Sequence, residues 1–282
     1  MPDVNDQAAL ERAFAGCDGV FHMAAVHPEY GFAETPEGRD SILATAVDGT
    51  TTALKAAKAA GVSRVVLTSS LAAVECGNDA GTLTESTWSK SEVYDSPAKL
   101  AETQWATHYT YVKSKVEQER AATAFAEEAG LDLRIVVPGN LCVGPIASTG
   151  LNGTMQRLKD VVTGTNTLKG AADLAIVHVA DVVLAHEKCM SVESASGRYL
   201  AAGDMVKIED VFAALKELYP SMPVAALENM DIASGIPGQS RKIETGRLAA
   251  ELGVNLTPFK TALKDSVDSM IEKQMIAIPA CA

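Results

Sequence analysis

The segment Ala44–Ser70, ATAVDGTTTALKAAKAAGVSRVVLTSS, contains the pattern that decides the fold class. Its first part, up to residue 60, is rich in Ala and Lys and carries Leu54 on an apolar stripe. This pattern predicts a helix over 44–60 that ends at Gly61, as a helix with a glycine cap does. Residues 64–68, RVVLT, follow at once and predict a short buried strand. A helix that leads directly into such a strand is typical of a parallel sheet with crossover helices.

The alternation of helix and strand continues on both sides of this segment. Upstream, a helical pattern over Gln7–Ala15 precedes a short apolar strand at Val20–Ala24. Downstream, a helical pattern over His108–Ala129 precedes a third strand at Leu133–Val137. The sequence therefore predicts an α/β fold with a parallel sheet over residues 1–145.

The pattern is looser in the second half of the chain. Gly and Thr are scattered over residues 147–173, and an apolar strand follows at Leu174–Val179. We expect a smaller α+β region over residues 146–282, with 174–190 returning to the main sheet. Its helices are expected at Asp181–Met190, Ile208–Leu218 and Phe259–Gln274.

The composition argues against several classes of function. The 282 residues include 24 Lys and Arg against 36 Asp and Glu, a formal net charge of −12 at pH 7. Binding to nucleic acid or to an anionic membrane surface requires clustered basic residues, and no part of this sequence concentrates them. The most apolar run, Leu174–Ala185, contains His178 and Asp181, so we expect no transmembrane helix.

The termini and the cysteines indicate the compartment. The first residues, MPDVND, lack the basic and apolar regions of a secretory signal, so we expect an intracellular, cytoplasmic protein. The cysteines are odd in number, far apart and without CxxC spacing, which predicts reduced thiols and neither a disulfide framework nor a metal site. They are Cys17, Cys76, Cys142, Cys189 and Cys281.

Tyr111 and Lys115 form the first candidate for catalytic chemistry. Residues four apart in a helix lie on the same face, one turn above each other. A phenol has a pKa of about 10. A neighbouring ammonium, together with a cationic oxidised cofactor, stabilises the phenolate and moves this pKa toward neutrality. The simpler interpretation is a solvated Lys over a Tyr ring, and an overlapping pair, Tyr109 and Lys113, has the same spacing.

Thr68 ends the predicted strand at 64–68, and the hydroxyl groups of Ser69 and Ser70 follow directly after it. In open α/β sheets, ligands bind outside the carboxyl ends of the strands, so a hydroxyl there can bind a substrate carbonyl. Each signal is weak by itself. The order of strand, hydroxyls, long loop, Tyr-x-x-Ser-Lys helix and strand ending in Pro138 is much more specific.

Taken together, these motifs resemble the extended short-chain dehydrogenase/reductases of the NAD-dependent epimerase/dehydratase superfamily. Within it, the chain is similar to the dihydroflavonol reductase and cinnamoyl-CoA reductase group, over nearly its whole length. The stretches that carry the resemblance are Gly16–His22, Arg64–Ser70, Tyr111-x-x-Ser114-Lys115 with Glu119, Ala180–His186 and Gly197–Leu200.

The resemblance implies a doubly wound, Rossmann-like sheet and an NAD(P)-dependent oxidoreductase that interconverts a carbonyl and an alcohol. Ser70 would polarise the carbonyl and Tyr111 would be the general acid in reduction. Lys115 would lower the pKa of Tyr111 and bind the nicotinamide ribose. Because the family has Ser directly before the catalytic Lys, Ser114 favours this register over the overlapping one.

The resemblance also implies a dinucleotide-binding domain over 1–145 and a mainly substrate-binding region over 146–282. Asp3 and Val4 would contact the adenine of NADP or NAD, and the strand ends would line the nicotinamide side. The implied cofactor-binding residues are Asp3, Val4, Met23, Ala24, Ala25, Thr68, Tyr111, Lys115, Pro138 and Leu141.

One family element is missing from the sequence. The family begins with a strand, a TGxxGxxG turn and a helix that holds the pyrophosphate. Gly16 and Gly19 follow a helix and precede a strand, which is the wrong order. We expect about two βα units to be absent and the strand at Val20–Ala24 to be an exposed sheet edge. This favours an incomplete gene product, and the alternative function is an inactive fragment or pseudoenzyme that acts as a binding module.

Other expectations are more general. The substrate is expected to be a small carbonyl or alcohol, although a sugar-nucleotide epimerase or a steroid dehydrogenase is an open alternative. A homodimer would use the helices at 44–60 and 108–129, by analogy with the superfamily. We expect His22 to be a hydrogen-bonded core residue and Trp88 to pack in the core.

Overall fold

The structure is a computed structural model of the 282-residue chain. It describes residues 3–25, 35–78, 81–90, 103–147, 150–165, 173–203, 205–224 and 241–277, and only the backbone of residues 103–107.

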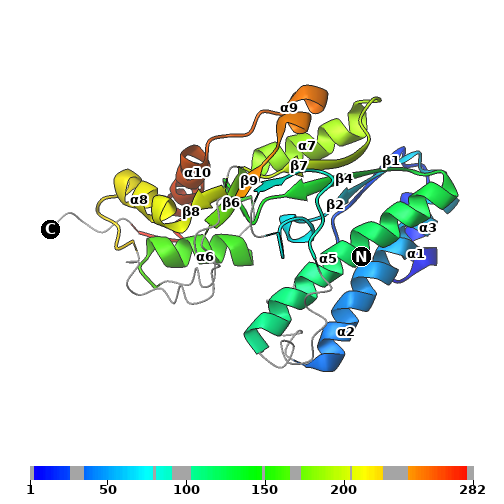
Figure 1. The fold of residues 1–282 in the computed structure, drawn as a ribbon, viewed down its shortest axis with the longest axis horizontal. Coiled ribbons are helices and arrows are strands. Elements are labelled where there is room, and N and C mark those ends of the chain that lie inside the picture. Colours follow the sequence, from blue (N-terminus) through cyan, green and yellow to red (C-terminus); the bar gives the residue numbers. More distant parts are fainter. Residues whose placement is uncertain are drawn as a thin grey trace.

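A four-stranded parallel sheet joins three strands of the first half of the chain to one strand of the second half (Figure 1). Its strands stand in the order β1 (Gly19–His22), β2 (Arg64–Thr68), β4 (Asp132–Pro138) and β7 (Gly197–Ala201). The side chains of β2 and β4 are buried on both faces, as the apolar runs predicted. The predicted Rossmann-like α/β fold is confirmed.

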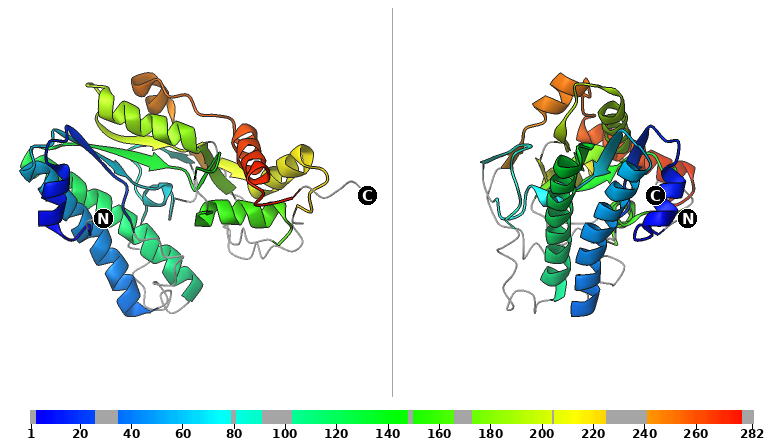
Figure 2. Two further views of the ribbon diagram at one scale, coloured as in Figure 1. Left: turned by 180° about the vertical axis from the view of Figure 1, so that it is seen from behind. Right: turned by 90° about the vertical axis from the view of Figure 1, so that its right-hand side faces the viewer.

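Helices cover both faces of this sheet (Figures 1 and 2). On one face lie α1 (Gln7–Phe14), α2 (Pro36–Ala44), α3 (Thr50–Ala59) and α5 (Thr103–Ala129). On the other face lie α7 (Val179–Ser191) and α9 (Gly246–Leu252).

The helix expected at 44–60 has a more complex form. A π-helical segment, η2 (Thr45–Gly49), joins α2 to α3, so the chain is helical from Pro36 onward. The end of the helix is as predicted, because Gly61 has a positive φ of 76°. The Thr35 side chain caps the start of α2 by accepting a hydrogen bond from the amide of Gly38.

The second half is built on a three-stranded sheet of β5 (Leu141–Val143), β6 (Asp173–His178) and β8 (Met205–Lys207). Helices α6 (Gly153–Val162), α8 (Ile208–Leu218) and α10 (Phe259–Glu272) pack on it around one apolar cluster. A short parallel pair, β3 (Gly81–Leu83) with β9 (Arg241–Ile243), links the long loop after β2 to the C-terminal region.

Only the second part of the segment 174–190 reaches the four-stranded sheet. Its strand, β6, pairs with β5 and β8, and the strand that joins the four-stranded sheet is β7. The two sheets approach each other closely after β4, because a Cβ on Gly139 would lie 2.5 Å from the carbonyl oxygen of Ala175. The part of the segment that contacts β2 and β4 is α7.

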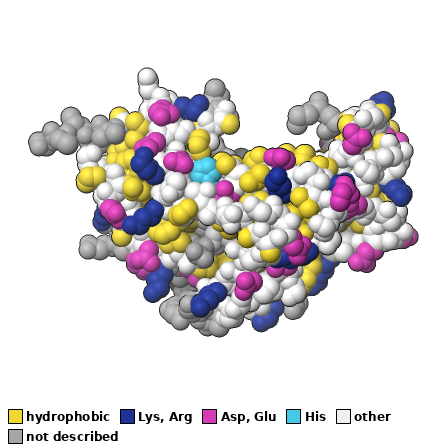
Figure 3. Space-filling model, turned by 90° about the horizontal axis from the view of Figure 1, so that it is seen from above, with side chains coloured by type: hydrophobic (Ala, Val, Ile, Leu, Met, Phe, Trp, Pro, Cys, Tyr) yellow, Lys and Arg dark blue, Asp and Glu magenta, His cyan; other side chains and the backbone are white. Residues whose placement is uncertain are grey.

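Among the described residues, β1 pairs with β2 alone and is an edge strand. Phe21 is 45% exposed and Met23 65% exposed at this edge, as expected for a strand without a second neighbour. None of the helices within the described ranges is long and apolar enough to cross a bilayer. On the face shown in Figure 3, Lys and Arg side chains are scattered among Asp and Glu.

Candidate active site

The structure brings Ser70, Tyr111 and Lys115 together where β2 ends against α5. Ser70 directly follows β2 and caps the short 3-10 helix η3 (Leu71–Ala73), its hydroxyl accepting a hydrogen bond of 3.3 Å from the amide of Ala72. This 3-10 helix packs against α5, which carries Tyr111 and Lys115. The carboxyl end of the buried strand therefore meets the face of α5 that carries Tyr111 and Lys115, at the edge where α/β sheets bind ligands.

The Tyr111 side chain contacts the Ser70 hydroxyl. Burial raises the pKa of the Tyr111 phenol, and a hydrogen bond with the Ser70 side chain opposes this rise. Burial is the larger of these two effects, and the lowering of this pKa by Lys115 together with an oxidised cofactor stays a prediction. Tyr111 is therefore protonated at neutral pH, which is the form that a general acid requires.

Lys115 is a buried ammonium beside this phenol. Its side chain is 4% exposed, and its Nζ atom lies 5.9 Å from the ring centroid of Tyr111. Burial lowers the pKa of Lys115 to about 8, and the charge of Glu119 opposes this change. Lys113, in the overlapping register, is only half-buried.

Glu119 connects the site to the sheet. Its carboxylate, 0% exposed, accepts a hydrogen bond from the Ser69 hydroxyl and lies 2.7 Å from Nε of Arg198 on β7. Burial raises the pKa of Glu119, and the Arg198 charge opposes this rise. The sequence indicated both residues separately, but their separation of 79 residues gave no sign that they form an ion pair.

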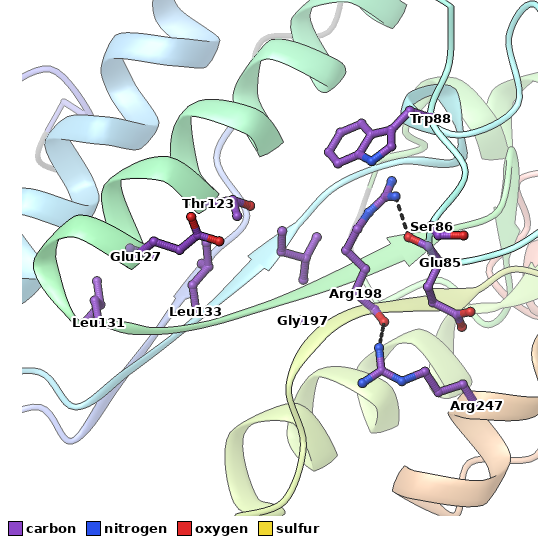
Figure 4. A pocket seen from close by; sticks show the side chains of 12 residues that line it. Glu85, Ser86, Trp88, Thr123, Glu127, Leu131, Leu133, Gly197, Arg198 and Arg247 are labelled. Atoms are coloured by element: carbon purple, nitrogen blue, oxygen red, sulfur yellow. Dashed lines mark hydrogen bonds between the residues drawn. The ribbon is translucent and has the colours of Figure 1, made fainter.

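Arg198 also fixes the loop after β3. Its guanidinium donates to the carbonyl oxygens of Glu85 (2.7 Å) and Thr87 (2.9 Å) and lies 4.1 Å from the ring centroid of Trp88 (Figure 4). Trp88 is half-buried and packs against this guanidinium rather than in the apolar core where it was expected. A cavity of about 580 Å³ beside this stack lies at the starts of β4 and β7, the opposite end of the strands from Ser70.

The predicted cofactor residues at the strand ends are found in two different environments. Met23, Ala24 and Ala25 are exposed at the end of β1. The Thr68 hydroxyl, at the end of β2, lies 2.7 Å from Nε2 of His186. Because Nδ1 of that imidazole donates to a backbone carbonyl, Nε2 accepts the Thr68 proton. Thr68 is therefore engaged within the protein.

The remaining predicted cofactor residues are spread more widely. Pro138 is half-buried at the end of β4. Leu141 is 3% exposed and belongs to the apolar cluster of the second half, so its side chain packs in the core. Asp3 and Val4 lie in the turn before α1, where Val4 packs so closely on Gly49 that a Cβ there would be 2.9 Å from it.

Three other side chains that could carry chemistry, those of His178, Asp181 and Cys142, are held in other environments. His178 caps α7 by accepting a hydrogen bond from the amide of Ala180, and Asp181 accepts two from Thr257. Burial and the charge of Asp181 raise the pKa of Cys142 to about 11, so this thiol stays protonated at neutral pH.

Comparison with solved structures agrees with the fold. Vestitone reductase from alfalfa superposes with a TM-score of 0.75 at 24% identity, covering 97% of this chain and 82% of that one. A yeast methylglyoxal/isovaleraldehyde reductase in complex with NADPH gives a TM-score of 0.76 at 22% identity, covering 97% and 83%. These likenesses define the class, a Rossmann-like α/β protein.

Sequence comparison gives the family. The model of the NAD dependent epimerase/dehydratase family matches residues 2–202, and the chain belongs to this family. It is 33% identical over 276 residues to cinnamoyl-CoA reductase 1 of Oryza sativa subsp. japonica, covering 96% of this chain and 74% of that protein. It is 30% identical over 282 residues to an anthocyanidin reductase of Vitis vinifera, covering 96% and 78%. The predicted family and the expected class of NAD(P)-dependent oxidoreductase are confirmed.

Proposed function

We propose that the protein is an NAD(P)-dependent reductase that interconverts a carbonyl and an alcohol through Ser70, Tyr111 and Lys115. The observation that carries this proposal is the contact of the Ser70 and Tyr111 side chains, with the buried Lys115 ammonium 5.9 Å from the Tyr111 ring centroid. The sequence relatives named above are reductases, which supports the same class of reaction. The substrate we propose is a carbonyl on a small or medium-sized organic molecule.

The residues at this sheet edge fit the nicotinamide and ribose end of the cofactor. The ends of β1, β2 and β4 supply backbone groups beside the catalytic cluster, and Ala24 and Ala25 are exposed there. An ammonium has three N–H donors. Lys115 is thus suited to hold ribose hydroxyl groups, and we propose that role for it. When bound, the reduced nicotinamide supplies the hydride.

The three side chains divide the remaining chemistry. The carbonyl oxygen accepts hydrogen bonds from the Ser70 and Tyr111 hydroxyls, which stabilise the negative charge that develops on it. Tyr111 then transfers its phenolic proton to this oxygen and gives the alcohol. The phenolate left on Tyr111 is stabilised by the ammonium of Lys115.

We extend the proposal to the two halves of the chain. Residues 1–145 would bind the dinucleotide, and residues 146–282 would mainly shape the substrate pocket. The support is that the proposed catalytic residues all precede Pro145, whereas the second apolar cluster is built mainly from residues after it.

The test is a titration of the 282-residue protein with NADPH and, separately, NADH. Nucleotide fluorescence and thermal unfolding are followed together. A ligand at about 100 times its Kd stabilises the native state by roughly 2.7 kcal/mol. Binding, followed by NADPH oxidation in the presence of aldehydes or ketones, would support the proposal. A folded sample that binds neither nucleotide would contradict it and favour the alternative of a binding module.

A further inference from the structure

A chain of buried hydrogen bonds leads away from Lys115. Its ammonium donates to Oε1 of Gln118 at 3.0 Å, and Nε2 of Gln118 donates to the Thr50 hydroxyl at 2.8 Å. The Thr50 hydroxyl in turn lies 3.0 Å from Nε2 of His22. The four residues come from α5, α3 and β1, and their exposed fractions are between 1% and 6%.

The hydrogen bonds of this network all run in one direction, with donors on the Lys115 side and acceptors on the His22 side. Burial and the charge of Lys115 lower the pKa of His22 to about 4, so its imidazole is neutral at pH 7 and has one nitrogen without a proton. Thr50 already accepts a hydrogen bond from Gln118, and its own proton is then available to His22 Nε2. Each of the three hydrogen bonds between Lys115 and His22 thereby pairs one donor with one acceptor.

The neutrality of Gln118 matters for the charge of Lys115. A buried ammonium is strongly destabilised unless it is hydrogen-bonded. A carboxylate acceptor would cancel the charge that a phenolate needs, whereas the amide oxygen of Gln118 satisfies the ammonium without cancelling it. The neighbouring carboxylate, Glu119, is engaged by Ser69 and Arg198. The titratable groups that face Lys115 are Tyr111 and Glu119 on α5 and His22 on β1.

We propose that Gln118, held by Thr50 and His22, is a positioning residue that fixes the Lys115 ammonium beside Tyr111 and keeps it charged. This inference rests on the proposed reductase function of Ser70, Tyr111 and Lys115. Thr50 and His22 act through Gln118 and touch no reacting atom.

The first experiment measures the pKa of Lys115 directly, by NMR titration of protein labelled with ¹³C and ¹⁵N in its lysines. The Lys115 signal is assigned with Lys115→Met. Gln118→Met keeps the length of the side chain but removes the acceptor, so it lowers the pKa of Lys115 by about one unit, the equivalent of one hydrogen bond. Gln118→Glu adds a negative charge and raises this pKa by at least as much. Glu128→Gln, an exposed change on the same helix, leaves it unchanged.

Opposite changes in the two Gln118 variants support the proposal. An unchanged pKa of Lys115 in both variants, or a change of this pKa in the same direction in both, overturns the proposal. If Gln118→Met does not fold, the comparison of Gln118→Glu with wild type still shows whether the pKa of Lys115 rises.

The second experiment measures the pH profile of carbonyl reduction in the same proteins. Activity declines on the alkaline side as Lys115 loses its proton. This decline moves to lower pH in Gln118→Met and to higher pH in Gln118→Glu. If the titrations behave as expected but wild type reduces no carbonyl, the reductase proposal fails and the positioning of Lys115 stands. If wild type is active but neither titration nor profile moves, the positioning proposal alone fails.

Discussion

Gln118 and Glu119, adjacent on α5, belong to two buried polar networks of opposite character. Gln118 links the Lys115 ammonium to Thr50 through neutral groups. Glu119 is paired directly with a second charge, the guanidinium of Arg198, which lies 2.7 Å away. The neutral network leaves the lysine charge available for chemistry, whereas the ionic network neutralises its own charges and joins distant elements. Changes to the neutral network should alter activity and pH dependence. Changes to the ionic network should alter the unfolding free energy.

The largest effect is expected from Tyr111→Phe, which removes the proposed proton donor beside the neutral network. Loss of a general acid lowers kcat by about 10²–10⁴-fold, because no other group supplies the proton to the developing alkoxide. NADPH oxidation with an aldehyde or ketone measures the loss, and NADPH binding should persist. Tyr109→Phe on the same helix is the matched control and keeps its activity. Equal losses in both variants would show that the assigned register is wrong.

Arg198→Met breaks the ionic network and tests stability. Removing Arg198 leaves the Glu119 carboxylate buried without its guanidinium partner, so we expect the unfolding free energy to fall by about 3–5 kcal/mol. Urea denaturation measures this loss. Arg120→Met is the control, because Arg120 is exposed and lies 5.4 Å from the same Trp88 ring. A loss of unfolding free energy no larger than that of the control would mean that the ion pair adds little to stability.

His22→Asn tests the far end of the neutral network through its pH dependence. The pKa of His22 is lowered from 6.5 to about 4, so between these values the unfolded chain binds a proton that the folded chain does not. Stability is therefore lost as the pH falls from 6.5 to 4, by roughly 3 kcal/mol at 1.36 kcal/mol per unit. Denaturation at several pH values should show this loss in wild type and its absence in His22→Asn. Parallel curves for the two proteins would exclude His22 as the source.

Trp88→Leu gives the smallest expected effect and sharpens the ionic side of the comparison. It removes the aromatic face that lies 4.1 Å from the Arg198 guanidinium but keeps the ion pair. A loss of about 1 kcal/mol in unfolding free energy is expected, with unchanged carbonyl reduction. Thermal unfolding and steady-state kinetics check the two halves of this expectation. A large loss of activity would instead place Trp88 in the catalytic machinery.

The parts of the fold that could be predicted have regular local patterns. β2 and α8 have the expected bounds, because an apolar run and a helical stripe are visible within a few residues. α6 was missed because Gly and Thr surround it, although Met155, Leu158 and Val161 have helical spacing and Asn152 caps it. β6 was placed in the wrong sheet, since strand pairing depends on contacts between segments far apart in the chain.

The same division holds in the candidate site. Ser70, Tyr111 and Lys115 could be predicted because a strand end and a four-residue helical spacing are local signals. Their supporting contacts could not, because Gln118 and Thr50 are 68 residues apart and Thr50 and His22 are 28 apart. Such separations leave no periodic trace in the sequence.

The π-helical segment η2 also sets the helical phase between α2 and α3. A π-helical turn accommodates one residue more than an α-helical turn, and each residue of an α-helix rotates its neighbours by about 100°. Both α2 and α3 pack on α5, so the extra residue allows the two helices to present different faces to it. Deleting one residue from η2 would rotate α2 against α3 by about this angle. Either the packing of α2 or the contact of Thr50 with Gln118 would then be lost.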